Sequence, residues 1–302
     1  MSEYGLIVAG RIVRMLAVRD EADVLPYNLE WYAGAGFETV AIDNGSTDGS
    51  YELCEEARRA GTLVALQRIA TERFEWRRLL EALFELAIEQ HPDYLMLTGA
   101  DEFFEVEKGG DLRDAMLEDF AAGYNVLAFP NMEFQMTDGD DPTEPNPLLR
   151  MRRYTFRRVG MSRAYPCLPG LDIVTRAGHA PVFPAGVEER ISQRYVSRHY
   201  PFRTPEQATR KLARMTDLPD GELRPEYVRY SGDPAEFVTK KGRLFPYLDD
   251  HDWKHEDRAA GDRLKKTQRA LVRLHQQHSE LEAEHAALRA AYAELQRHLA
   301  ER

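Results

Sequence analysis

Short apolar segments alternate with amphipathic segments over roughly the first 130 residues of the chain. In the second kind of segment, Leu25, Leu29 and Tyr32 recur at helical spacing, and so do the apolar residues between Leu79 and Ile88. Five apolar segments have the length and composition of β-strands: Ile12–Val18, Thr39–Asp43, Leu63–Gln67, Tyr94–Thr98 and Val126–Phe129. This alternation predicts an α/β domain with a mixed, mostly parallel sheet flanked by helices.

The second predicted strand ends in a polar turn, Asn44–Ser50. Within that turn Ser46 is predicted to cap the next helix, and Gly61 to end it. Ligands of open α/β sheets bind at the carboxyl ends of the strands, so this turn is a candidate binding segment.

The alternating pattern stops between Asn131 and Asp172. The first part of this stretch is rich in Asp and Pro, which predicts a loop or lid. Five arginines follow: Arg150, Arg152, Arg153, Arg157 and Arg158. They predict either a solvated strand face or a binding site for an anionic substrate.

The last forty residues differ from the rest of the chain. Leu274, Leu281, Leu288 and Leu295 repeat every seven residues, which predicts a short coiled coil and a homo-oligomer formed through residues 264–299. An amphipathic helix that packs on its own domain is the alternative, because polar residues interrupt the second apolar position of the seven-residue repeat. The predicted division is a catalytic domain over 1–255 and a helical tail over 256–302.

Composition narrows the function classes. The formal net charge of −11 makes nucleic acid an unexpected partner. Cys54 and Cys167 lack the spacing of a zinc site and are expected to be reduced thiols. No segment has the apolar length of a membrane span, so a cytoplasmic location is expected.

Three polar clusters follow predicted strands. The first is Arg19-Asp20-Glu21, the second runs from Asp43 to Ser50, and the third is Gly99-Ala100-Asp101-Glu102-Phe103. Carboxylates on turns can accept hydrogen bonds from a nucleotide base or ribose, and hard oxygen ligands suit Mg²⁺ or Mn²⁺ bridging a diphosphate. Each cluster also has a plainer reading as a turn, a helix cap or a surface ion pair.

In order and spacing, the three clusters resemble the signature of family 2 glycosyltransferases, in the branch whose acidic motif reads Asp-x-Asp-Glu-Phe. The segment Arg198-His199-Tyr200-Pro201, with Lys211 in the helix after it, extends the resemblance, which covers roughly residues 12–215. It implies a GT-A fold, a nucleoside-diphosphate sugar donor (a UDP-sugar above all), a hydroxyl acceptor, Mg²⁺ or Mn²⁺, and inversion at the anomeric carbon. This chain departs from the motif at Gly99, where the family has its first aspartate.

The resemblance also implies roles for individual residues. The nucleotide-binding residues would be Arg19, Glu21, Asp43, Asn44 and Asp101. Asp101 and His199 would hold the metal, with His179 competing for the second position.

An inverting transfer needs a base near the acceptor hydroxyl. Glu133 is the first candidate because it follows the strand Val126–Phe129, and Asp138 and Asp172 are the others. A degenerate nucleotide-sugar-binding scaffold that self-associates through its tail is the alternative to an active enzyme.

Overall fold

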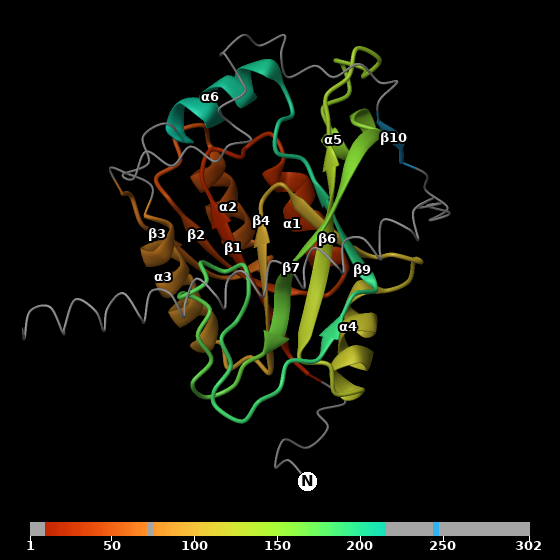
Figure 1. The fold of residues 1–302 in the computed structure, drawn as a ribbon. Coiled ribbons are helices and arrows are strands. Elements are labelled where there is room, and N and C mark those ends of the chain that lie inside the picture. The colour runs from red at the N-terminus through yellow and green to blue at the C-terminus, as the bar shows by residue number, and fades with distance from the viewer. Residues whose placement is uncertain (1–9, 72–74, 216–243, 248–302) are drawn as a thin grey trace, which may run out of the picture. The chain divides into compact units, whose positions relative to one another are not determined.

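The computed structural model describes residues 10–71, 75–215 and 244–247 (Figure 1). The predicted boundary at 255–256 and the predicted coiled coil over 264–299 lie outside these ranges. The described helices are α1 (Leu25–Gly34), α2 (Ser50–Arg59), α3 (Trp76–Ile88), α4 (Leu112–Ala121), α5 (Pro147–Arg150) and α6 (Pro205–Met215).

One mixed sheet contains the described strands. They are β1 (Ile12–Val18), β2 (Glu38–Asp43), β3 (Leu63–Arg68), β4 (Tyr94–Gly99), β5 (Glu102–Val106), β6 (Val126–Phe134), β7 (Arg153–Pro166), β8 (Ile191–Ser192), β9 (Tyr195–His199) and β10 (Phe245–Pro246). The order along the main path is β3-β2-β1-β4-β7-β6-β9-β5, with β8 on β6 and β10 on β7.

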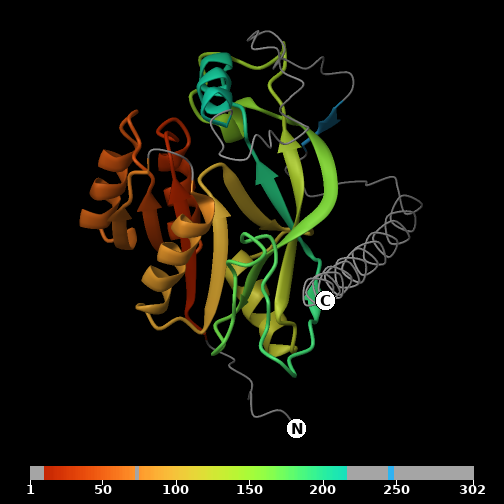
Figure 2. The same cartoon turned by 60° about the vertical axis from the view of Figure 1, so that its left-hand side comes forward.

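The sheet has two halves, which Figure 2 shows as red and orange strands on one side and green strands on the other. Strands β3, β2, β1 and β4 run parallel, and β7 joins β4 in the antiparallel direction. Because parallel strands need crossover connections, α1, α2 and α3 fall between them in sequence. This confirms the predicted fold class: α/β, with a mixed central sheet flanked by helices, as expected of a GT-A domain.

Helices cover both faces of the parallel half. On one face, Val13 and Met15 of β1 pack with Leu79, Leu80 and Leu83 of α3. On the other face, the alternate β1 residues Leu16 and Val18 pack with α1 and α2, and Ile12 packs with α1 and α4. Successive side chains of a strand point to opposite faces, so β1 contributes to both layers of the core.

Two local predictions were wrong. The strand predicted over Val126–Phe129 continues to Phe134, so Asn131-Met132-Glu133-Phe134 belongs to β6 and not to a loop. The helix after β2 begins at Ser50 with Gly49 as its N-cap, and not at Ser46. Gly61 does follow the end of that helix, in the left-handed conformation that suits this position (φ 81°).

Among the described helices, none combines the length and the apolar character needed to cross a membrane.

Candidate functional site

The turns that follow β1 and β2 are joined by side-chain hydrogen bonds. The backbone N–H of Asp20 donates to Ser46 Oγ at 2.9 Å, and that of Glu21 donates to Ser50 Oγ at 2.8 Å. In the other direction, the N–H of Thr47 donates to Asp20 Oδ1 at 2.6 Å. The first two sequence clusters therefore form one structural unit, which we call the paired turns (residues 19–22 and 43–50).

Asp20 holds a strained backbone within the paired turns. Its φ of 50° lies in the left-handed region, which is uncommon for a residue other than glycine. Such strain persists only where the surroundings stabilise it, and here Ser46 and Thr47 do so.

Asp43 and Asn44, two residues predicted to bind a nucleotide, lie at the carboxyl end of β2. The buried Asp43 carboxylate accepts from the N–H groups of Gly45 and Ser46 and lies 3.3 Å from Arg68 Nε. In the amide orientation that satisfies both of its groups, Asn44 accepts from Arg19 Nη1 at 3.2 Å. In this arrangement Asp43 shapes its own turn, and Asn44 orients Arg19.

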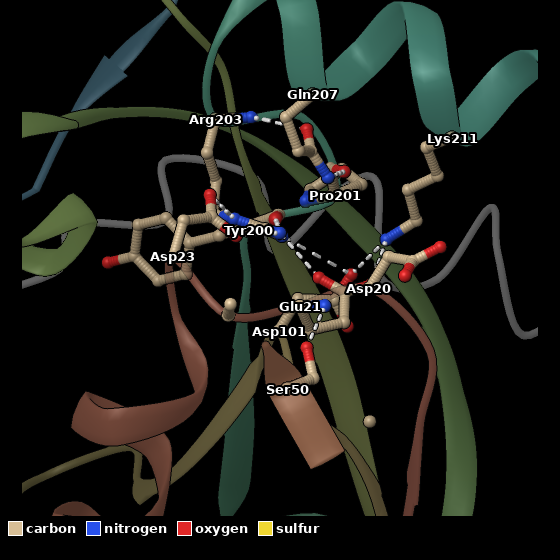
Figure 3. Close-up of polar contacts among 12 residues, drawn as sticks. Asp20, Glu21, Asp23, Ser50, Asp101, Tyr200, Pro201, Arg203, Gln207 and Lys211 are labelled. Atoms are coloured by element: carbon tan, nitrogen blue, oxygen red, sulfur yellow. Dashed lines mark hydrogen bonds and ion pairs between the residues drawn. The ribbon is translucent and has the colours of Figure 1, made fainter. Parts of the chain in front are cut away.

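The paired turns contribute Glu21 to an ionic cluster that also contains Asp23, Asp101, Arg203 and Lys211 (Figure 3). Glu21, Asp101 and Arg203 are buried, whereas the side chain of Asp23 is 40% exposed at the rim of the cluster. The Arg203 guanidinium, whose side chain is 0% exposed, donates to both carboxylate oxygens of Asp23 at 2.8 Å and also to Glu21. Its remaining nitrogen donates to the carbonyl of Tyr200 at 2.8 Å. Buried charges are stable only when they are paired and hydrogen-bonded, and these contacts meet that condition.

Lys211 reaches from α6 into the same cluster. Its Nζ donates to Asp101 Oδ2 at 2.6 Å and to Glu21 Oε1 at 3.0 Å. Burial alone would raise the pKa of the Asp101 carboxyl, but Lys211, His199 and Arg203 hold that pKa well below its usual value. Burial likewise opposes the charge on Lys211, yet Asp101 and Glu21 raise the pKa of its ammonium. Both groups are therefore charged at neutral pH.

His199 and Glu133, two of the predicted site residues, are neighbours in the sheet. His199 Nε2 lies 3.6 Å from Asp101 Oδ2, and the strand registers place His199 of β9 next to Glu133 of β6. Burial lowers the pKa of the His199 imidazole, but the negative charges of Asp101, Glu102 and Glu133 together raise it above its usual value. His199 thus borders the ionic cluster, and Glu133 lies beside His199, where its carboxylate accepts from Gln135 Nε2 at 3.4 Å.

The other candidates have contacts elsewhere. His179 Nδ1 contacts Met161 Sδ at 3.4 Å, and the His179 carbonyl accepts from Ser162. Asp172 accepts from Val174 and Thr175 within its own turn, which lowers the pKa of its carboxyl. Neither residue has a contact with Asp101 among the described interactions.

The residues around Asp101 do not form a site for a divalent ion. Within the described ranges, no three His, Cys, Asp or Glu side chains are grouped to hold one. After Asp101, Glu102 is the nearest carboxylate in sequence to position 99, where the resembled motif has an aspartate, but it is held by the N–H of Gly99 at 2.8 Å and by Arg163 at 2.7 Å. Lys211 Nζ already contacts the carboxylate of Asp101.

The packing around Gly99 leaves no room for a side chain at this position. A Cβ at this position would lie 2.7 Å from Asp101 Oδ1, and Lys211 and His199 hold that carboxylate in place. We expect Gly99→Ala to lower the free energy of unfolding by about 1–3 kcal/mol. Gly34→Ala is the matched control, because its Cβ would meet no atom within 4 Å, and it should be neutral or slightly stabilising. Urea unfolding of both variants checks this, and equal stability of the two would contradict it.

Sequence reasoning gave no roles to Asp23, Arg203 and Lys211. A signal was present for Lys211: Ala208, Leu212 and Met215 recur at helical spacing, and Lys211 falls on the same face of the helix. A lysine on a buried helix face indicates a carboxylate partner, although the pattern cannot say which one.

Next to His199, several buried polar atoms lack a hydrogen-bond partner. They include Asn131 Oδ1, Ser197 Oγ and His199 Nδ1. Asn131 and Ser197 are register partners on β6 and β9, and His199 lies two residues beyond Ser197 on the same face. Buried polar groups are normally satisfied, so this polar face is suited to water or to a hydroxyl-bearing ligand.

No protein-family model matches the chain, and no curated protein matches it. Among solved structures, it is similar to a mannosyltransferase from Pyrobaculum calidifontis in complex with GDP-Man and Mn²⁺ (17% identity, 41% of this chain and 36% of that chain, TM-score 0.31). It is also similar to residues 1–349 of S. aureus TarS (12% identity, 69% of this chain and 66% of that chain, TM-score 0.38). A third similar structure is a nucleoside-diphosphate-sugar pyrophosphorylase from Vibrio cholerae RC9 (12% identity, 67% of this chain and 99% of that chain, TM-score 0.29).

The chain thus spans only about a third of the mannosyltransferase and just under two thirds of the TarS fragment. Identities this low leave the function to be inferred from the chain's own residues.

Proposed function

We propose that this chain is an inverting glycosyltransferase that moves a sugar from a nucleoside-diphosphate sugar, above all a UDP-sugar, to a hydroxyl acceptor. One observation carries the proposal: the ionic cluster at the carboxyl ends of β1 and β4 borders a face of buried polar atoms that lack partners. Cations beside a hydrogen-bonding face suit a diphosphate joined to a sugar.

The paired turns support a nucleotide position next to that cluster. Arg19 has a buried Nε without a partner, and it is oriented by Asn44. The same turns bring Glu21 to Lys211. A base or ribose that lies over these turns would leave its diphosphate near Lys211.

Glu133 is the proposed base. It would take the proton of the acceptor hydroxyl while the acceptor oxygen bonds to the anomeric carbon from the side opposite the diphosphate. The bond from that carbon to the diphosphate oxygen breaks in the same step, and the nucleoside diphosphate leaves as an anion. His199, next in register to Glu133, would place a hydrogen-bonding group beside the reacting centre.

The test separates binding from turnover. Calorimetry with UDP, GDP, dTDP and CDP should identify one nucleotide that binds, and release of that nucleotide from its sugar should report turnover. Glu133→Gln should bind with unchanged affinity and lose turnover by about 10²–10⁴-fold. Glu52→Gln, an exposed carboxylate of α2, is the control and should match the wild type.

Two results would contradict the proposal. Binding without turnover in the wild type would favour the degenerate nucleotide-binding scaffold. Absence of binding by every nucleotide would exclude both the enzyme and the nucleotide-binding scaffold.

A further inference from the structure

Lys211 Nζ lies between two carboxylates that come from different strand ends. It is 2.6 Å from Asp101 Oδ2, after β4, and 3.0 Å from Glu21 Oε1, after β1 (Figure 3). A metal ion also suits a position between the oxygens of two separate carboxylates. In this chain the positive charge at that position is the ammonium group of Lys211.

The surrounding residues suit a lysine better than a divalent ion. Gly99 provides no side chain, and a Cβ there would press on Asp101. Glu102 is held by Arg163. A divalent ion prefers six or more oxygen ligands, or several waters beside its carboxylates, whereas an ammonium needs only three acceptors.

Lys211 also has capacity for a ligand. An ammonium carries three N–H donors, and the described contacts of Lys211 use two of them. Its side chain is 14% exposed, whereas that of Arg203 is 0% exposed and directs its donors to protein groups. Lys211 is therefore positioned to touch a ligand, whereas Arg203 holds Glu21, one of the two carboxylates that position Lys211.

We propose that Lys211 takes the place of the divalent metal, so that the chain binds its nucleoside diphosphate without metal and Lys211 donates to a diphosphate oxygen. The inference rests on the proposed function for the identity of the ligand. The part of the inference that concerns metal is independent of that function, because it depends only on which cation lies between the carboxylates of Glu21 and Asp101.

The first arm measures Mn²⁺ alone, by the loss of its free-ion paramagnetic resonance signal on addition of protein. The wild type should leave the signal unchanged. Lys211→Ala removes the ammonium and also empties the space that it fills, so the carboxylates of Glu21 and Asp101 become available to a cation and Mn²⁺ binding should appear. Adding Asp101→Asn to Lys211→Ala should abolish that binding again, and circular dichroism checks that each variant is folded.

Two outcomes would overturn the proposal. Stoichiometric Mn²⁺ binding by the wild type would show that metal displaces Lys211, and this measurement needs no variant to fold. Absence of Mn²⁺ binding by folded Lys211→Ala would show that the two carboxylates do not form a cation site.

The second arm measures the nucleotide that binds in the panel above. Its dissociation constant in the wild type should be the same with excess chelator as with Mn²⁺, and Lys211→Met should weaken binding in chelator by about 10-fold or more. Lys108→Met removes an exposed lysine that follows β5 and has no described contact with the ionic cluster, so it serves as the matched control for loss of a lysine. Loss of nucleotide affinity on chelation in the wild type would overturn the inference. If the chain binds no nucleotide, the proposed function is wrong. The Mn²⁺ measurements then still test whether Lys211 occupies a cation site.

Discussion

Arg203→Leu is expected to lower the free energy of unfolding by about 3–5 kcal/mol. The Arg203 guanidinium is fully buried, and it donates to Asp23 and Glu21 and to the carbonyl of Tyr200. Without it, the buried carboxylate of Glu21 keeps Lys211 as its cation partner but loses the other, whereas Asp23, whose side chain is 40% exposed, is left to solvent. A buried carboxylate that loses a partner keeps the penalty of desolvation, and the backbone carbonyl of Tyr200 loses its donor as well.

Urea unfolding followed by circular dichroism measures this change. Arg59→Leu is the matched control, because Arg59 is exposed and pairs with Glu55 across one helical turn at 3.5 Å. Exposed pairs contribute about 0–1 kcal/mol, so that variant should unfold close to the wild type. An equally small effect of Arg203→Leu would mean that the cluster is solvated and not buried.

Arg198→Met is expected to have an effect of the same order, about 3–5 kcal/mol, for a second buried pair. Arg198 Nη1 lies 3.0 Å from Glu105 Oε1, and its other nitrogens donate to the hydroxyl of Tyr200. The guanidinium also lies 4.4 Å from the centre of the Tyr247 ring. Removing this cation leaves Glu105 buried and negative, with the hydroxyl of Tyr247 as its remaining described side-chain partner.

A double-mutant cycle tests whether the unpaired carboxylate causes the loss. Arg198→Met with Glu105→Gln removes both charges, so the double variant should be less destabilised than Arg198→Met alone. The corresponding coupling energy is about 0.5–3 kcal/mol. If the two single changes simply add in urea unfolding, the loss comes from packing against the aromatic rings instead.

The sequence predicted those features of the site that depend on the ends of parallel strands. Asp43 is the last residue of β2, Asp101 follows β4, and β1 lies between these two strands. Hydrophobic alternation defines strands and their ends, so the convergence of the polar clusters at one edge follows from the topology. The start of α2 was not predicted correctly because Ser46 uses its hydroxyl to accept from Asp20, whereas local capping rules consider only the helix itself.

The partners of the site residues could not be read from the pattern. Lys211 is separated from Asp101 by 110 positions and from Glu21 by 190, and periodicity carries no information about such contacts. Nor does an apolar pattern show where a strand continues through polar residues. Residues 131–134 extend β6 because backbone pairing with β7 and β9 satisfies them, although the side chains of Asn131 and Glu133 are polar.

The paired turns also bear on the entropy of ligand binding. Ser46, Ser50 and Asp48 bond to backbone N–H groups of residues 20–22, so two loops that would otherwise move independently are ordered together. Their conformational entropy is lost once, when the chain folds, and a ligand arriving there need not order them again. Preorganised surfaces bind more tightly for the same contacts, because association then carries a smaller entropic penalty. The hydrogen bonds between the two turns, which form when the chain folds, therefore lower the entropic penalty for any ligand that binds at the ends of β1 and β2.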